Sequence, residues 1–239
     1  MNNTVVVSLG GSLLFAHNSK YYEKAGKKPE YDEKFLKELT STIKEASTQV
    51  KLAIVVGGGA LAKTYCEQQR KNGKNEFFAD RAAITATIEN AQKLAKTLGD
   101  NATIANSFDE ASQAIENNKI ALLHGMLEGI TTDTVAVLTA ERLDAQALVN
   151  ASNINAIYDS DPNKNPKAKK FNSMTHKQLI KLAFENDDRT ARTNFPFDLV
   201  ASKLAARENL EIRFVNGNKA ANIKKAILNQ KFEGTLVKN

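Results

Sequence analysis

The chain has few of the residues that build disulfides and metal sites. Cys66 is the only cysteine among the 239 residues, which rules out an internal disulfide and fits a reducing compartment such as the cytoplasm. The three histidines, His17, His124 and His176, share no spacing typical of metal ligands. We therefore expect no metal site built on histidine or thiolate side chains, and we interpret Cys66 as a small packing residue.

Long apolar segments are also missing. No stretch approaches the length that crosses a membrane, and no basic segment followed by an apolar one stands at the start of the sequence. We therefore expect neither an anchor nor a signal peptide, and a cytoplasmic location. A hydrophobic content of 42% with 25% charged residues is typical of a globular protein.

The net charge of +6 could indicate a nucleic-acid partner. Much of the excess lies in residues 164–170 and around Lys20, Lys24, Lys27 and Lys28, and no aromatic platform of an RNA-binding module accompanies it. A solvated loop is the favoured interpretation, so a nucleic-acid partner is not expected. A positive field also suits anionic nucleotide substrates.

Two glycine-rich turns, each following an apolar run, are the most informative feature present. Residues 4–9 lead into Gly10, Gly11 and Ser12. Residues 52–56 lead into three consecutive glycines, residues 57–59, which include Gly58 and Gly59. Backbone N–H groups at the start of a helix suit a phosphate group. The two turns together predict that two phosphate-bearing molecules are held close together, as phosphoryl transfer requires.

Each turn also has a purely structural interpretation. The spacing matches neither the Walker A loop nor the dinucleotide fingerprint. The first turn could simply be a tight connection that glycine permits, and both interpretations stay open there. The second turn favours an anion site, because Lys63 follows it within the next helix.

Alternating segments predict an α/β fold in which helices cover a mostly parallel sheet. We expect one domain with two lobes around a cleft, and polar surface loops over residues 16–29 and 152–171. The predicted strands are about 4–9, 52–56, 103–105, 120–123, 145–150, 211–215 and 235–237. The predicted helices are about 32–47, 60–70, 79–98, 107–116, 134–142, 176–184, 198–208 and 220–229.

Three further features have both a functional and a structural interpretation. In residues 125–133, hydroxyls at a helix start could hold a phosphate, but a plain N-cap with Asp133 in the first turn is the simpler interpretation. Tyr158 and Asp161 follow a strand at the edge where α/β proteins bind ligands, yet they could belong to an ordinary surface loop. Asp80 could cap the long helix or accept from ribose hydroxyls.

In this order, these segments resemble the amino acid kinase superfamily and, within it, the archaeal-type uridylate kinases. The resemblance spans nearly the whole chain and is most specific at residues 129–136 and 152–162. It implies a three-layer α/β/α sandwich, a hexamer, and transfer of the ATP γ-phosphate to UMP with Mg²⁺ held mainly through phosphates. It also implies an acceptor lobe over about residues 1–145 and an ATP lobe over about 146–239.

The resemblance further implies roles for individual residues, with no metal bound by side chains. Contact with ATP phosphates is implied for Gly10, Gly11, Ser12, Gly59 and Lys63, of which Ser12 and Lys63 would be catalytic. Contact with UMP is implied for Gly58, Asp80, Met126, Leu127, Glu128, Gly129, Ile130, Thr131 and Thr132. Contact with adenosine is implied for Ser152, Asn153, Tyr158 and Asp161, and Asp198 would lie near the nucleotide.

Several positions depart from the family pattern. Ser8 stands where many members have lysine, Lys63 replaces the usual arginine, and Glu128 adds a negative charge to a proposed anion loop. Asn155 and Ala156 replace an Asp-Gly pair. The glycine-serine stretch before Asp198 is absent, and that region contains Arg189, Arg192 and Thr193. Two other hypotheses therefore stay open: a kinase for isopentenyl phosphate or an acyl acceptor, and a non-catalytic nucleotide-binding or storage assembly.

Overall fold

One sheet of eight strands lies at the centre of the computed structural model, which describes residues 3–16, 28–160, 165, 167–185 and 197–239. Its strand order is β3-β4-β2-β1-β5-β7-β8-β6, and only β7 and β8 pair antiparallel. The strands are β1 (Thr4–Leu9), β2 (Lys51–Val56), β3 (Ala102–Ile104), β4 (Ile120–Leu123), β5 (Ala147–Ser152), β6 (Ser173–Met174), β7 (Ile212–Asn216) and β8 (Gly234–Val237).

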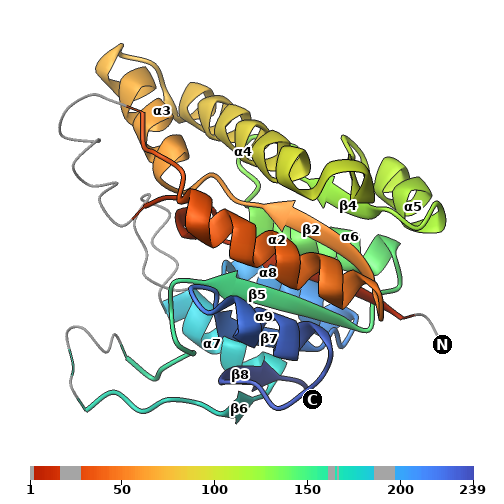
Figure 1. Cartoon of the computed structure of the whole chain (residues 1–239). Coiled ribbons are helices and arrows are strands. Elements are labelled where there is room, and N and C mark those ends of the chain that lie inside the picture. The colour runs from red at the N-terminus through yellow and green to blue at the C-terminus, as the bar shows by residue number, and fades with distance from the viewer. Residues whose placement is uncertain (1–2, 17–27, 161–164, 166, 186–196) are drawn as a thin grey trace.

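Helices cover both faces of this sheet, which explains why its central strands are continuous apolar runs. In Figure 1, α2 and α9 lie in front of the sheet and α6 and α8 lie behind it. The first face carries α2 (Glu33–Ser47), α3 (Gly59–Lys71), α4 (Glu76–Leu98) and α9 (Ala220–Ile227). The second face carries α5 (Phe108–Glu116), α6 (Thr132–Arg142), α7 (His176–Glu185) and α8 (Leu199–Arg207). The predicted three-layer α/β/α fold is confirmed.

Side-chain caps fix several helix starts close to the predicted positions. Asp32 accepts a hydrogen bond from the Phe35 N–H at the start of α2, and Ser107 accepts one from the Glu110 N–H at the start of α5. Thr131 and Asp198 cap α6 and α8 in the same way. Each cap satisfies a backbone donor that the first turn of a helix leaves free.

One strand prediction was wrong, and one strand was missed. The strand predicted to end at Asn150 continues through Ser152, because Ala151 and Ser152 keep their pairing with Val215 and Asn216 of β7. The segment expected to be loop up to residue 171 is followed by β6, which pairs with β8 over only two residues. Such a short strand is set by its partner and leaves no periodic pattern in the sequence.

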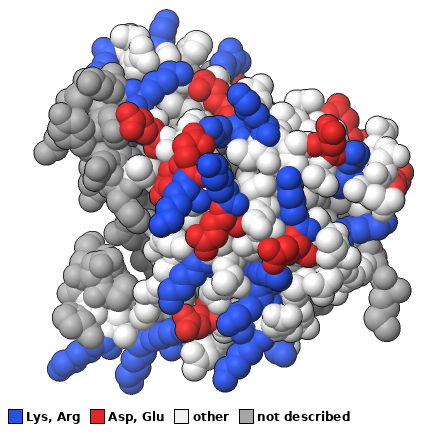
Figure 2. All heavy atoms as spheres, in the orientation of Figure 1, with Lys and Arg blue, Asp and Glu red and all other residues white. Residues whose placement is uncertain are grey.

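The surface of the α2 face mixes charges of both signs. Lys93 pairs with Glu33, and Lys224 pairs with Glu45. Figure 2 shows lysines and arginines interspersed with carboxylates across this face. Among the residues that the structure describes, no helix combines the length and apolar character needed to cross a membrane.

Candidate active site

The two glycine-rich turns lie directly against each other at the carboxyl ends of β1 and β2. A Cβ atom added to Gly11 would lie 2.2 Å from the carbonyl oxygen of Gly57, and one added to Gly59 would lie 2.3 Å from the carbonyl carbon of Gly11. No side chain fits in that space, and Gly59 also has a positive φ of 56°. The glycines therefore allow two backbone segments from different strands to touch.

These touching turns present free hydrogen-bond donors. Among the described residues, no protein acceptor takes a hydrogen bond from the backbone N–H groups of Gly11, Ser12, Gly58 or Gly59. Gly11 and Ser12 begin the short 3-10 helix η1 (Gly11–Leu14), and Gly59 begins α3. The geometry therefore places two helix starts with free N–H groups side by side, an arrangement that suits an anion.

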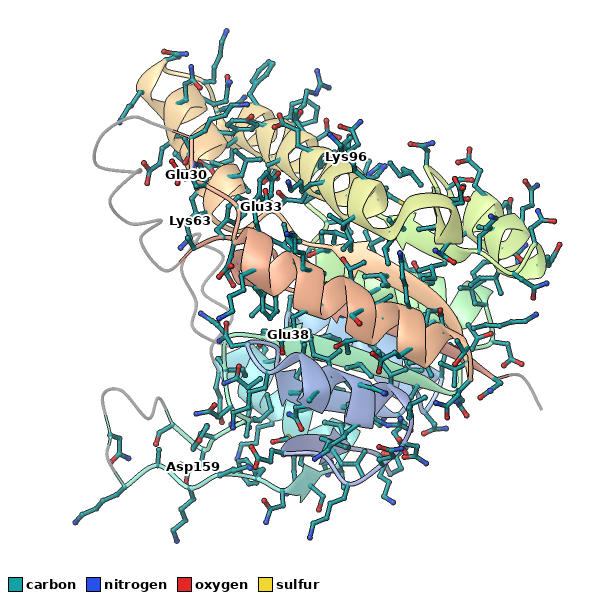
Figure 3. All side chains as sticks on the ribbon, viewed as in Figure 1. Glu30, Glu33, Glu38, Lys63, Lys96 and Asp159 are labelled. Atoms are coloured by element: carbon teal, nitrogen blue, oxygen red, sulfur yellow. The ribbon has the colours of Figure 1, made fainter. Side chains whose placement is uncertain are left out.

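One cation, Lys63, lies near the start of α3, the helix that follows the triple-glycine turn. Lys63 is exposed in the second turn of α3, and Figure 3 shows it extending from the beginning of α3 toward the left of the view. Asp159, which follows β5, lies on the same side of the molecule below it. An exposed ammonium on the helix that begins at the free backbone donors can neutralise charge on a phosphate.

A half-buried acidic side chain, Asp133, lies close to the first glycine turn. The Ser8 hydroxyl and the Asn150 side-chain amide each donate to Oδ1 of Asp133 at 2.8 Å. Desolvation raises the pKa of Asp133 to about 7; hydrogen bonds from Ser8 and Asn150 oppose the rise, and the nearby charge of Asp198 adds to it. Asp133 is therefore poised to change charge near neutral pH.

Asp198 joins this group from α8. Its carboxylate accepts hydrogen bonds from the hydroxyls of Thr131 and Thr134, and it also caps its own helix through the Ala201 N–H. The sequence interpretation had linked Asp198 to the nucleotide but had treated Asp133 only as a helix-dipole residue. The missing signal was the pairing of Ser8 with Asn150 on adjacent strands, which a sequence without strand order does not contain.

The predicted UMP loop, residues 126–132, is tied to the start of α4. Asp80 accepts a hydrogen bond from the Gly129 N–H at 2.9 Å, and Arg81 pairs with Glu128 at 3.0 Å. The pKa of Glu128 is lowered, first by a backbone hydrogen bond at Glu128 itself and then by Arg81. Because of this pairing, the charge that departs from the family pattern has a partner beside it.

The side chains of this loop divide into two groups. Met126 and Ile130 pack against the apolar core, whereas Leu127 is exposed. The Thr131 hydroxyl is used by the cap of α6 and by Asp198, and Thr132 is half-buried. A ligand at this loop would therefore meet mainly its backbone groups.

The proposed adenosine side is less complete. Ser152 ends β5 beside Gly10, Asn153 is exposed, and Tyr158 is half-buried and forms a backbone bridge with Lys170. The side-chain oxygens of Asn150 and Ser152 are buried without a hydrogen-bond partner among the described residues. Of the residues considered for the site, Asp161, Arg189, Arg192 and Thr193 lie outside the described residues, as do His17, Lys20, Lys24 and Lys27 elsewhere in the chain.

Comparisons with known proteins agree on one family. A model described as the amino acid kinase family matches residues 3–216. The chain is 37% identical over 237 residues to the uridylate kinase of Methanocaldococcus jannaschii, covering 98% of each protein. It superposes on the crystal structure of uridylate kinase from Archaeoglobus fulgidus with a TM-score of 0.79 at 30% identity, covering 98% of this chain and 99% of that one. The UMP kinase of Ureaplasma parvum has a TM-score of 0.81 at 20% identity over both whole chains, and it supports the fold alone.

Proposed function

The chain belongs to the amino acid kinase family, and we propose that it transfers the γ-phosphate of ATP to UMP, giving UDP and ADP. The relatives named above are uridylate kinases that match over nearly their full length. This agreement favours UMP over the isopentenyl phosphate and acyl acceptors that the sequence left open. It equally favours an enzyme over a storage assembly.

The contact between the two glycine turns is the observation that carries the mechanism. A UMP phosphate oxygen is already an anionic nucleophile, so the reaction needs no general base. Catalysis then depends on holding two phosphates in line and on neutralising the charge of the group in transfer. Free N–H groups at Gly11 and Gly59, in touching backbone segments, suit that task.

We assign the two substrates to opposite sides of this contact. ATP phosphates would bind at Gly10, Gly11, Ser12, Gly59 and Lys63, and the adenosine would bind near Ser152, Asn153, Tyr158 and Asp161. UMP would bind Gly58, Asp80 and the backbone of residues 126–132. Lys63 and Ser12 would touch the group in transfer, so these two are the proposed catalytic residues.

The acidic pair of Asp133 and Asp198 has the chemistry to contact a magnesium ion carried by ATP. Their carboxylates, and the unpartnered oxygens of Asn150 and Ser152, are hard oxygen donors of the type that Mg²⁺ prefers. Although the resemblance implies no side-chain ligand, these residues would help the ATP phosphates to hold the ion, which would neutralise phosphate charge when bound. Asp133 would hold its negative charge once a cation is close, because an opposite charge favours ionisation.

A coupled assay of ADP release across the nucleoside monophosphates with Mg-ATP tests the function. We expect UMP to give the highest turnover, and a protein inert toward UMP would exclude the proposal. Lys63→Ala should lower kcat by about 10²–10³-fold, because it removes one electrostatic stabiliser of the transferring group. Lys71→Ala, an exposed lysine at the end of the same helix, is the control and should keep the parental rate.

We also propose a cytoplasmic hexamer with an acceptor lobe over about residues 1–145 and an ATP lobe over about 146–239. Family resemblance supports the hexamer, and the single cysteine fits the compartment. Light scattering after size exclusion measures the assembly directly, and a monomeric mass would exclude the hexamer.

A further inference from the structure

One buried face of α4 carries two polar side chains within an apolar stripe. Thr87 is 5% exposed and Asn90 is 0% exposed, and Ala86, Ala91 and Leu94 are buried on the same side of the helix. A buried amide or hydroxyl is costly unless it is hydrogen-bonded. What these two groups bind therefore indicates what they do.

Asn90 holds the triple-glycine turn by its carbonyl groups. Its Nδ2 donates to the carbonyl oxygen of Gly57 at 2.7 Å and to that of Gly58 at 3.1 Å. In a trans peptide the C=O and the following N–H point to opposite sides. Anchoring these two carbonyls on α4 therefore aims the N–H groups of Gly58 and Gly59 away from the helix.

The orientation of the Asn90 amide is fixed from its other end. The Tyr31 hydroxyl donates to Asn90 Oδ1 at 3.0 Å, so the amide nitrogen must face the glycines. Desolvation raises the pKa of Tyr31 to about 12, which keeps this hydroxyl protonated at neutral pH. The Tyr31 ring stacks on Phe15, directly after η1, with centroids 4.8 Å apart.

Thr87 holds the beginning of the UMP loop. Its hydroxyl accepts a hydrogen bond from the Gly125 N–H at 2.9 Å and donates to the Ile84 carbonyl at 2.7 Å. A Cβ atom on Gly58 would lie 3.5 Å from the Thr87 methyl carbon, so this side chain also borders the glycine turn. Thr87 and Asn90 are three residues apart and therefore neighbours on the helix surface.

We infer that Thr87 and Asn90 are positioning residues, whose hydrogen bonds hold the triple-glycine turn and the UMP loop next to each other on α4. The inference rests on the proposed function for its kinetic consequences, but the anchoring of the two backbone segments on α4 concerns only the protein. Asn90 acts on the turn where the two phosphates meet, whereas Thr87 acts on the loop assigned to UMP alone. The two residues should therefore affect different kinetic constants.

Steady-state kinetics separate these effects. Asn90→Leu should lower kcat by about 10²-fold, because the N–H groups of Gly58 and Gly59 are no longer held in their orientation. Thr87→Val should raise the KM for UMP about tenfold with kcat nearly unchanged, because the Gly125 N–H loses its acceptor, and Thr87→Ser should restore the parental KM. Thr85→Val and Gln92→Leu, at exposed positions of the same helix, are the controls and should match the parent. Parental constants in Thr87→Val and Asn90→Leu would overturn the inference.

Nuclear magnetic resonance of ligand-free protein labelled with ¹⁵N-glycine tests, without any substrate, whether Asn90 and Thr87 anchor these backbone segments on α4. Asn90→Leu should shift the amide signals of Gly58 and Gly59, and Thr87→Val should shift that of Gly125, while the signal of distant Gly73 stays in place. Unchanged signals would overturn the inference even in an active enzyme. Shifted signals in a protein that is inert toward UMP would instead support the anchoring by Asn90 and Thr87 and exclude the proposed function.

Discussion

The two sides of the candidate site differ in how completely the protein satisfies its own polar groups. On the acceptor side, Gly125, Gly129 and Glu128 all have partners on α4. On the ATP side, the oxygens of Asn150 and Ser152 are buried without partners among the described residues. The loop proposed to bind UMP is therefore held by the protein's own hydrogen bonds, whereas the side proposed to bind ATP has buried oxygens that a bound nucleotide or its cation would satisfy.

The largest expected effect comes from the glycine contact that joins the two sides. Gly59→Ala places a methyl group against the Gly11 backbone and demands a positive φ from alanine, so kcat should fall by about 10³-fold. Gly73→Ala is the matched control, because Gly73 also has a positive φ but nothing within 4 Å of an added Cβ. The control should lose only about 1–2 kcal/mol of stability, measured by urea unfolding, and should keep its kcat. An active Gly59→Ala enzyme would contradict the assignment of this contact.

Asp133→Asn tests the side of the site that is proposed to bind ATP. The asparagine side chain keeps an oxygen that can accept hydrogen bonds from Ser8 and Asn150, but the substitution removes the negative charge beside the proposed Mg²⁺. We expect kcat to fall by about 10²-fold and the fold to survive. Turnover over a range of Mg²⁺ concentrations measures this effect. Parental turnover at every Mg²⁺ concentration would remove Asp133 from the mechanism.

Asp80→Ala tests the side of the site that is proposed to bind UMP. Without the carboxylate, the Gly129 N–H has no anchor on α4, so the KM for UMP should rise about tenfold while the KM for ATP stays the same. Asp100→Ala, at an exposed aspartate two residues beyond the end of α4, serves as the control. Equal changes in the KM for UMP and the KM for ATP would contradict the assignment of Asp80 to the UMP side alone.

The smallest expected effect is on stability against pH. The folded-state pKa of Asp133 is about 7, above its value of 3.8 when unperturbed, so the folded protein binds more protons between those values. Ionisation of Asp133 therefore lowers stability as pH rises through this window. Relative to the parent, Asp133→Asn should gain a few degrees in Tm as the pH rises from about 4 to about 7 without ligand.

His176 changes the stability in the opposite direction, so the variant must be compared with the parent at each pH. Burial lowers the pKa of His176, so the stability of both proteins falls as pH drops below the ordinary histidine range. The difference in Tm between variant and parent cancels this common contribution. A difference that does not change with pH would contradict the raised pKa of Asp133.

The sequence predicted the elements that local chemistry determines. Strands β1 and β2 are continuous apolar runs, and the caps at Asp32, Ser107 and Asp198 lie where short polar side chains precede helical periodicity. These signals lie within a few residues of one another. They were therefore sufficient for the layer order and for most helix starts.

Contacts between distant residues could not be predicted in the same way. The hydrogen bond from Asn90 to Gly57 spans 33 residues, and that from Ser8 to Asp133 spans 125. A lone asparagine on an apolar helix face was the available signal for the first contact. The second depends on the order of the strands, which brings β1 beside β5.

The backbone contact between Gly11 and Gly59 has a consequence for how such a protein diverges. Amide donors of the main chain persist when neighbouring side chains mutate, so drift at most positions leaves the phosphate cradle intact. Selectivity for the acceptor can then evolve in the surrounding loops while the reaction centre stays the same.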